Sequence, residues 1–298
     1  MRDFNYSWKA AFCPGRDINF FDSPIRQTID LEVTGYSHTN ALVLAELSRL
    51  IYKRDADEIG QKAYAKTRNT FLGLVGLQEV SLFITPKSQG ALIVPIDGRP
   101  FTILVFRGTY NLTGWLTNIC AYPLINWTEG GKVHQGFAKA FNTIWEPISS
   151  RLKSMNSPII ITGHSLGGAF ALLAATKLKE SLHSVYTFGM PPVGDSDFVH
   201  SLDKLPYFRI INSSDIIVRS SSFLPYLKHG GELHRLGDMP PSPLSEDGQY
   251  DSQDINTVSP ISNQTAIRRW YDTPKFISDH APINYVVKLE RFYQEIHR

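Results

Sequence analysis

The segment IIITGHSLGG, residues 159–168, decides how this chain of 298 residues folds. Its first three residues form a β-branched run typical of a buried strand, and the residues after Ser165, LGGAFALLAATKLKE, are typical of a helix. Ser165 stands between Gly163 and Gly167 in the pattern G-x-S-x-G, where a sharp turn brings strand and helix backbones close together. The segment therefore predicts a strand, a tight turn that exposes the Ser165 hydroxyl, and a helix over 166–181.

The segments on either side of this turn also alternate between strand and helix patterns. Apolar runs bounded by Gly, Pro or polar residues predict further strands, which lie at 69–85, 90–96, 99–109 and 183–189. Apolar residues at helical spacing predict helices at 39–53 and 134–153. This alternation predicts an α/β domain with a mainly parallel central sheet.

One stretch, 238–264, has a different composition that is rich in Pro, Ser, Asp and Gln. Such a composition cannot bury much apolar surface, so it predicts a long surface insertion. A domain boundary there is the alternative, but the 34 residues that follow are few for an independent core. We therefore expect a single domain over 1–298.

Charge and composition narrow the possible partners. The chain has 30 basic and 28 acidic residues and no long basic block, so nucleic acid is not an expected partner. No apolar run approaches the roughly 20 residues that span a bilayer, and the first residues lack the apolar segment of a signal peptide. Both a cytoplasmic protein and a secreted protein without its leader fit this pattern.

The chain contains two cysteines, Cys13 and Cys120. Two thiols are too few for a disulfide scaffold or for a thiolate metal site. A single bridge between them and two buried thiols are the two interpretations that the sequence leaves open.

Ser165 needs two partners if its hydroxyl is to act as a nucleophile. A base must remove the hydroxyl proton, and a carboxylate must hold a histidine base in the correct tautomer. When the nucleophile lies between a strand and a helix in this way, the chain order is Ser, acid, His. The histidines that remain after this order is applied are His229, His234, His280 and His297.

Six segments together resemble a known family. They are FRGT (106–109), KVHQGF (132–137), ITGHSLGGA (161–169), TFGMPPVGD (187–195), RIINSSDIIV (209–218) and DHAPINY (279–285). In this order they resemble the class 3 lipases, the fungal-type triacylglycerol lipases, and the likeness extends over roughly 90–285. The resemblance implies an α/β-hydrolase fold, in which helices flank a mostly parallel sheet and a short lid covers the site.

The resemblance also assigns a catalytic triad. It implies that Ser165 is the nucleophile, Asp215 the orienting acid and His280 the general base. Asp215 follows the apolar run YFRII, and a strand end is where this fold needs its acid. Asp195 remains the alternative for the acid, and His229 the alternative for the base.

Further residues of the matching segments receive supporting roles. The backbone N–H of Leu166 lies at a helix start and would point to where an oxyanion forms. The resemblance implies that Thr109 supplies the second oxyanion donor. His134 and His164 lie inside the matching segments, and we interpret both as structural hydrogen-bonding residues.

The segment 110–119 corresponds to the lid of the family. On a helix one apolar face would be formed by Leu112, Trp115, Leu116 and Ile119. Gly114 would weaken such a helix, and Asn118 stands where many members of the family have an acid. A surface turn whose apolar residues complete the core is the alternative.

The resemblance implies a lipase that releases fatty acids from acylglycerols at a lipid–water interface, without a metal or an organic cofactor. The chain is expected to work as a monomer. A phospholipase A1 or another carboxylesterase would use the same residues, because pocket and lid shape set the substrate. A lipase-like binding protein without turnover is an alternative of another class.

Overall fold

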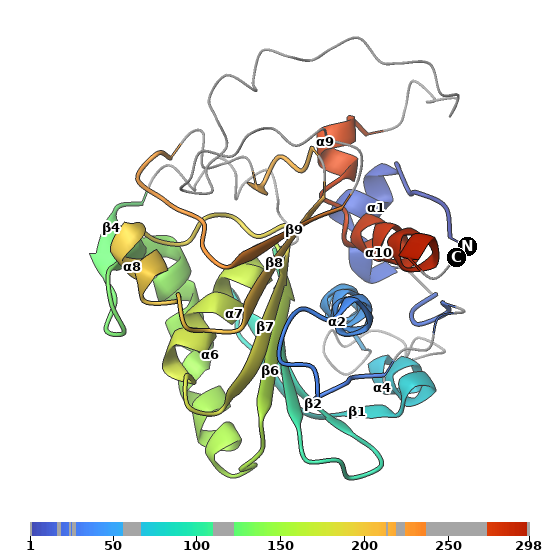
Figure 1. The fold of residues 1–298 in the computed structure, drawn as a ribbon, viewed down its shortest axis with the longest axis horizontal. Coiled ribbons are helices and arrows are strands. Elements are labelled where there is room, and N and C mark those ends of the chain that lie inside the picture. The colour runs from blue at the N-terminus through green and yellow to red at the C-terminus, as the bar shows by residue number, and fades with distance from the viewer. Residues whose placement is uncertain are drawn as a thin grey trace.

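A mainly parallel β-sheet forms the centre of the computed structural model (Figure 1). The structure describes residues 2–16, 19–23, 25, 28–55, 67–109, 122–212, 214–218, 224–236 and 273–296. In these residues the sheet has seven strands, in the order β1-β2-β3-β6-β7-β8-β9. The strands are β1 (Leu77–Ile84), β2 (Gln89–Pro95), β3 (Thr102–Phe106), β6 (Ile159–His164), β7 (Leu182–Phe188), β8 (Tyr207–Asn212) and β9 (Glu232–Leu236). Strands β3, β6, β7, β8 and β9 pair in parallel, whereas β1, β2 and β3 pair antiparallel at one side of the sheet.

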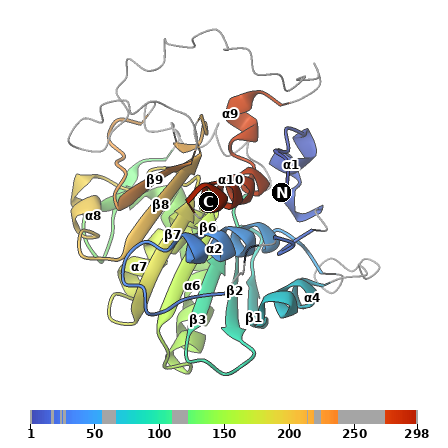
Figure 2. The same ribbon diagram turned by 45° about the vertical axis from the view of Figure 1, so that its right-hand side comes forward.

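Helices cover both faces of the sheet (Figures 1 and 2). The long ones are α2 (His38–Leu50), α6 (Gln135–Lys153), α7 (Leu166–Lys177) and α10 (Pro282–Ile296). Side chains alternate along a strand, so Ile103 of β3 joins the apolar core under α2 and α10, and Leu104 joins the core under α6 and α7. The predicted α/β-hydrolase arrangement, a mainly parallel sheet between helices, is confirmed.

Parallel pairing brings four strand ends to one edge of the sheet. Thr109 follows β3, Ser165 follows β6, Gly189 follows β7, and Asp215 follows β8. Residues far apart in the sequence are thereby placed around one region, which is the region that the candidate site occupies.

Several boundaries differ from the predictions. Helix α7 ends at Lys177, four residues before the predicted end at 181, because Leu178 leaves the helical conformation. The predicted strand over 69–85 is wrong in its first half, where α4 (Arg68–Leu72) and a 3₁₀ turn (Gly73–Val75) precede β1. Thr67 explains the difference, because its side chain accepts a hydrogen bond from Thr70 N and caps α4.

Other elements had no sequence prediction. They are β4 (Leu124–Asn126), β5 (Lys132–His134), β9, α1 (Trp8–Phe12), a 3₁₀ turn (Pro14–Arg16), α8 (Ser196–His200), α9 (Lys275–Ser278) and α10. Strands β4 and β5 form a small antiparallel pair outside the main sheet. Helices α9 and α10 matter most for the site, because His280 lies between them.

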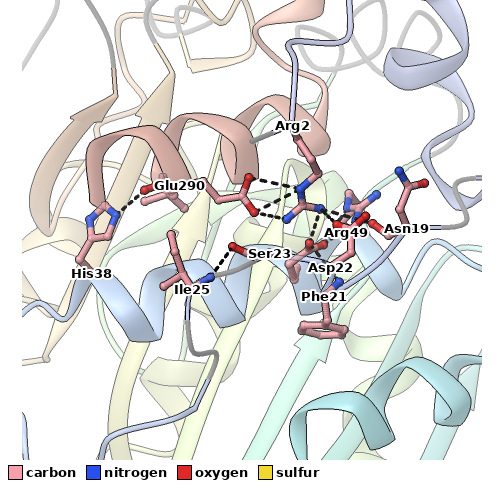
Figure 3. A network of polar contacts seen from close by, with 11 residues as sticks. Arg2, Asn19, Phe21, Asp22, Ser23, Ile25, His38, Arg49 and Glu290 are labelled. Atoms are coloured by element: carbon pink, nitrogen blue, oxygen red, sulfur yellow. Dashed lines mark hydrogen bonds and ion pairs between the residues drawn. The ribbon is translucent and has the colours of Figure 1, made fainter. Parts of the chain in front are cut away.

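A buried ionic network ties the N-terminal segment to helices α2 and α10 (Figure 3). Arg2 Nη1 lies 2.6 Å from Glu46 Oε1 of α2, and Arg2 also forms an ion pair with Glu290 of α10. Arg49 Nε donates to the second oxygen of Glu46 at 2.8 Å, and its guanidinium lies over the ring of Phe20. The network therefore joins three segments that are distant in the sequence.

Some sequence predictions fall outside the described residues. These include the candidate lid over 110–119 with Leu112, Trp115, Leu116 and Ile119, the insertion over 238–264, and Cys120. The sequence left open a bridge between Cys13 and Cys120 or two buried thiols, and the structure shows Cys13 as a free, half-buried thiol. Among the helices that the structure describes, none combines the length and apolar character needed to cross a membrane.

Candidate active site

The turn between β6 and α7 holds Ser165 in a strained backbone conformation. Its φ is 57° and its ψ is −128°, a combination that costs a non-glycine residue about 1–3 kcal/mol. A Cβ on Gly163 would lie 2.3 Å from the carbonyl carbon of Gly167, and a Cβ on Gly167 would lie 2.3 Å from Phe106 O. Both glycines are therefore required by backbone contact, as the G-x-S-x-G pattern predicts.

Asp215 and His280 form a buried pair. His280 Nδ1 lies 2.9 Å from both carboxylate oxygens of Asp215. The backbone N–H of Ile217 donates to Asp215 Oδ1 at 2.8 Å, and the hydroxyl of Tyr285 donates to Oδ2 at 2.6 Å. Because the Asp215 carboxylate accepts from Nδ1, it fixes the His280 tautomer with a proton on Nδ1 and a free lone pair on Nε2.

Backbone contacts bring Ser165 to this pair. Ser165 N donates to Phe188 O at 2.9 Å, and the next residue, Gly189, lies directly against the pair. A Cβ on Gly189 would lie 2.6 Å from Asp215 Oδ2 and 3.2 Å from His280 Nδ1. Gly189 also has a φ of 57°, so only glycine suits this position.

The Ser165 side chain is buried, with 1% of the residue exposed. Among the described residues, no group forms a hydrogen bond with its Oγ. Catalytic hydrogen bonds are often long before substrate binds and shorten only in the complex. The sequence predicted that this turn exposes the hydroxyl, whereas the structure buries it.

The segment after β3 lies against the same turn. A Cβ on Gly108 would lie 2.7 Å from His164 O, so the segment that leads to Thr109 runs beside the residue that precedes Ser165. Leu166 is the first residue of α7, where backbone N–H groups have no acceptor inside the helix. Thr109 therefore follows a residue that contacts this turn, and Leu166 directly follows Ser165.

His164 links Tyr52, which follows α2, to the loop of His280. Its Nε2–H donates to His280 O at 2.8 Å, so its Nδ1 accepts from the hydroxyl of Tyr52 at 3.1 Å. Its ring centroid lies 4.5 Å from that of His280. Burial lowers the pKa of His164 well below the usual histidine range, and the nearby His280 lowers it further. His164 is thus a neutral residue that positions the His280 backbone.

Comparison with known proteins identifies the family. Residues 103–224 match the sequence model of the class 3 lipases. A lipase of Caenorhabditis elegans is 30% identical to this chain over 234 residues, which are 72% of this chain and 64% of that protein. The chain belongs to the class 3 lipase family.

Another relative of this class 3 lipase is the secreted mono- and diacylglycerol lipase 1 of Fusarium solani, which is 27% identical over 193 residues. The match covers 60% of this chain and 55% of the fungal protein. The chain thus spans less than two thirds of the length of these two relatives.

Solved structures support the fold of this class 3 lipase. The crystal structure of the lipase from Rhizopus microsporus var. chinensis aligns with a TM-score of 0.56 at 22% identity. The alignment covers 76% of this chain and 84% of the fungal chain. This similarity concerns the α/β-hydrolase fold alone.

The alternative acid and base of this class 3 lipase have other contacts. Asp195 caps α8 by accepting from Phe198 N at 2.9 Å, and it also accepts from Lys132 N at 3.0 Å. His229 Nε2–H donates to Val218 O at 3.2 Å, and burial lowers its pKa well below the usual range. The structure brings neither residue into contact with the Asp215–His280 pair.

His134 has the structural contact that the sequence suggested. It precedes α6, and its Nδ1 accepts from Phe137 N at 3.3 Å. It therefore caps that helix, and its ring also packs against Phe137.

Tyr285 is a site residue that the sequence analysis did not single out. It lies inside the quoted segment DHAPINY, three residues into α10, and its hydroxyl also accepts from Asn212 N at 3.1 Å. Burial raises the pKa of Tyr285 well above its usual range, and the charge of Asp215 raises it further. Tyr285 therefore stays protonated and remains a donor to Asp215. This contact joins residues 70 positions apart, so no local pattern in the sequence indicates it.

Metal chemistry has no obvious site in the described residues. No cluster of three or more His, Cys, Asp or Glu side chains there is arranged to hold a metal ion. The fold does pair an imidazole with a carboxylate, His280 with Asp215.

Proposed function

We propose that this chain is a serine carboxylic-ester hydrolase that acts on acylglycerols. In this proposal Ser165 is the nucleophile, His280 the general base and Asp215 the acid that orients it. The backbone N–H groups of Thr109 and Leu166 hold the oxyanion. No metal or organic cofactor takes part.

The proposed reaction has two halves. Ser165 Oγ attacks the ester carbonyl while His280 Nε2 takes the hydroxyl proton, and the tetrahedral intermediate then releases an alcohol that leaves with that proton. Water attacks the acyl-enzyme in the same way, and the fatty acid leaves as Ser165 recovers its proton. Each oxyanion donor is expected to stabilise the transition state by roughly 3 kcal/mol.

One observation carries the proposal: a strained Ser165 lies at a strand–helix turn, and its neighbours Phe188 and Gly189 adjoin the buried Asp215–His280 pair. Strain of this kind persists only where surrounding contacts impose it, and it is concentrated at functional sites. A serine with only a structural role in such a turn would not need an oriented imidazole beside it.

The substrate class rests on the relatives. Both relatives are named lipases, and the name of the Fusarium protein specifies mono- and diacylglycerols. We extend acylglycerol hydrolysis to this chain, and we propose that it acts as a monomer at a lipid–water interface. Light scattering coupled to size-exclusion chromatography would test the monomer.

The central experiment measures hydrolysis of p-nitrophenyl esters from C2 to C16 and of mono-, di- and triacylglycerols. Wild type is compared with Ser165→Ala and with a matched control, Ser150→Ala, which alters an exposed serine of α6. We expect wild type and Ser150→Ala to be equally active and to react with a fluorophosphonate probe. Ser165→Ala should lose at least about 10⁴-fold in kcat and should not be labelled.

Two results would contradict the proposal. If the probe labels Ser165→Ala as strongly as wild type, Ser165 is not the nucleophile. If wild type hydrolyses no ester faster than Ser165→Ala does, the chain is a lipase-like protein without turnover. Activity on phospholipids in place of acylglycerols would keep the mechanism and change the substrate class.

A further inference from the structure

The acid and the base of the proposed triad lie on two separate segments, which must be held at a fixed distance from each other. Asp215 lies in the segment that follows β8, and His280 lies between α9 and α10. These residues are 65 positions apart in the sequence. The geometry of the pair therefore depends on what joins the two segments.

Asp279, the residue before His280, makes two of the hydrogen bonds that join these segments. Its Oδ2 accepts from Ser214 N, the residue before Asp215, at 3.1 Å. Its backbone carbonyl accepts from Asn212 Nδ2 at 2.8 Å. A further backbone bond, from Ile216 N to Phe276 O at 3.2 Å, runs parallel to these contacts.

The carboxylate of Asp279 is buried, and Lys275 Nζ lies 2.7 Å from its Oδ2. The Lys275 side chain is 52% exposed, so this ion pair is screened by water and contributes little to stability. The bond to Ser214 N is of another kind, because a buried carboxylate that accepts from a backbone N–H is a strong and directional contact. The buried hydrogen bond therefore indicates that Asp279 fixes the position of Ser214.

We propose that Asp279 is a positioning residue that aligns Asp215 and His280 by holding Ser214 N. It touches neither substrate nor reacting atoms. Its side chain fixes the residue before the acid, and its own backbone leads into the base, so the bond to Ser214 N ties the position of Asp215 to that of His280. The proposal rests on the proposed function, because it gives a role to that same triad.

This role predicts a loss in turnover without a loss in substrate binding. Asp279→Leu keeps the approximate size of the side chain and removes the acceptor for Ser214 N. A misplacement of catalytic groups by about 1 Å can reduce rates by 10²-fold, so we expect kcat to fall about tenfold or more, with KM within twofold of wild type. Asp279→Asn retains a carbonyl oxygen that can accept from Ser214 N, so its kcat should stay within threefold of wild type.

Lys275→Met is the matched control, because it removes the ion pair and leaves the bond to Ser214 N. Each variant is assayed on a soluble short-chain ester, and kcat is expressed per active site titrated with a fluorophosphonate. We expect Lys275→Met to match wild type. A purely structural role for Asp279 would lower the number of titratable sites and leave kcat per site unchanged.

The outcomes separate this inference from the proposed function. If wild type is not labelled and has no activity, the proposed function fails. If wild type is active but Asp279→Leu keeps its kcat per site, or Asp279→Asn loses as much as Asp279→Leu, the positioning role is overturned. If Asp279→Leu does not fold, Asp279→Ala replaces it. Failure of both variants to fold, while Asp279→Asn folds, assigns Asp279 to stability and also overturns the inference.

Discussion

The ionic network of Arg2 offers a quantitative test of the packing between the N-terminal segment and α10 (Figure 3). Arg2 donates to Glu290 through Nε at 3.2 Å and also through Nη2, and the Glu290 side chain is 2% exposed. Glu46 would keep Arg49 as a partner if Arg2 were replaced. The change Arg2→Met therefore removes an ion-pair partner from Asp22 and from Glu290. The Asp22 side chain is 45% exposed and can be solvated by water, so Glu290 is the buried carboxylate that loses its ion pair.

Removing one member of a buried ion pair destabilises a protein by about 3–5 kcal/mol. Arg2 is 13% exposed, so some solvent reaches the pair, and we take the lower value of about 3 kcal/mol. Unfolding entropy of about 2.1 cal/mol/K per residue gives about 0.6 kcal/mol/K for a chain of this length. Arg2→Met should therefore lower Tm by about 5 °C.

The assay is thermal unfolding followed by circular dichroism at neutral pH. The control is Arg291→Met on the same helix, whose side chain is 36% exposed and whose loss should change stability by about 1 kcal/mol or less. The double variant Arg2→Met with Glu290→Gln removes the unpaired charge and should recover part of the loss. A Tm of Arg2→Met within 1 °C of wild type, or no recovery in the double variant, would refute the reasoning.

Three further predictions concern the site and the buried histidines. Tyr285→Phe removes the hydroxyl bond to Asp215, so urea unfolding should show a loss of about 2–3 kcal/mol, and an unchanged midpoint would contradict this. His164 and His229 have pKa values well below the usual histidine range, so they stay neutral in the folded state, whereas the unfolded chain binds protons below about pH 6.5. The free energy of unfolding therefore has its full value above that pH and should fall as the pH drops, by up to about 2.7 kcal/mol per pH unit for two protons. His229→Gln removes one of the two histidines, so it should halve this slope when the free energy is measured by urea unfolding across pH 4.5–7. Gly163→Ala places a Cβ 2.3 Å from a backbone carbon, so no soluble protein that reacts with a fluorophosphonate should be obtained, and a labelled, soluble variant would show that the turn can relax.

Local constraints explain which parts of the site the sequence could predict. The turn at Ser165 was predictable because its glycines stand in the G-x-S-x-G pattern between a strand run and a helix run, and the contact that requires Gly163 lies within that strand–turn–helix unit. Asp215 could be placed at a strand end, whereas the choice of His280 over His229 needed the resemblance to a family. The three-dimensional contacts then separate the two histidines, since His280 bonds to Asp215 and His229 bonds to a backbone carbonyl.

The features that escaped the sequence analysis depend on partners far away in the chain. Tyr285 contacts Asp215 across 70 positions, and Arg2 contacts Glu290 across 288 positions. Neither contact leaves a periodic or compositional signal. The start of the predicted strand over 69–85 failed for a local reason, because the cap at Thr67 outweighs the apolar pattern.

The strained backbone conformation of Ser165 is maintained by the packing around it. A positive φ at a non-glycine residue costs about 1–3 kcal/mol, so the turn would relax if neighbouring contacts did not hold it. Those contacts come from the sheet itself: Gly163 meets Gly167, and Gly167 meets Phe106 O of the adjacent strand. Because β6 pairs with both β3 and β7, relaxing the turn would disturb central strands that carry both apolar cores. The free energy that keeps Ser165 strained thus comes from burial of the whole sheet, and this is why a strained nucleophile can persist at its edge.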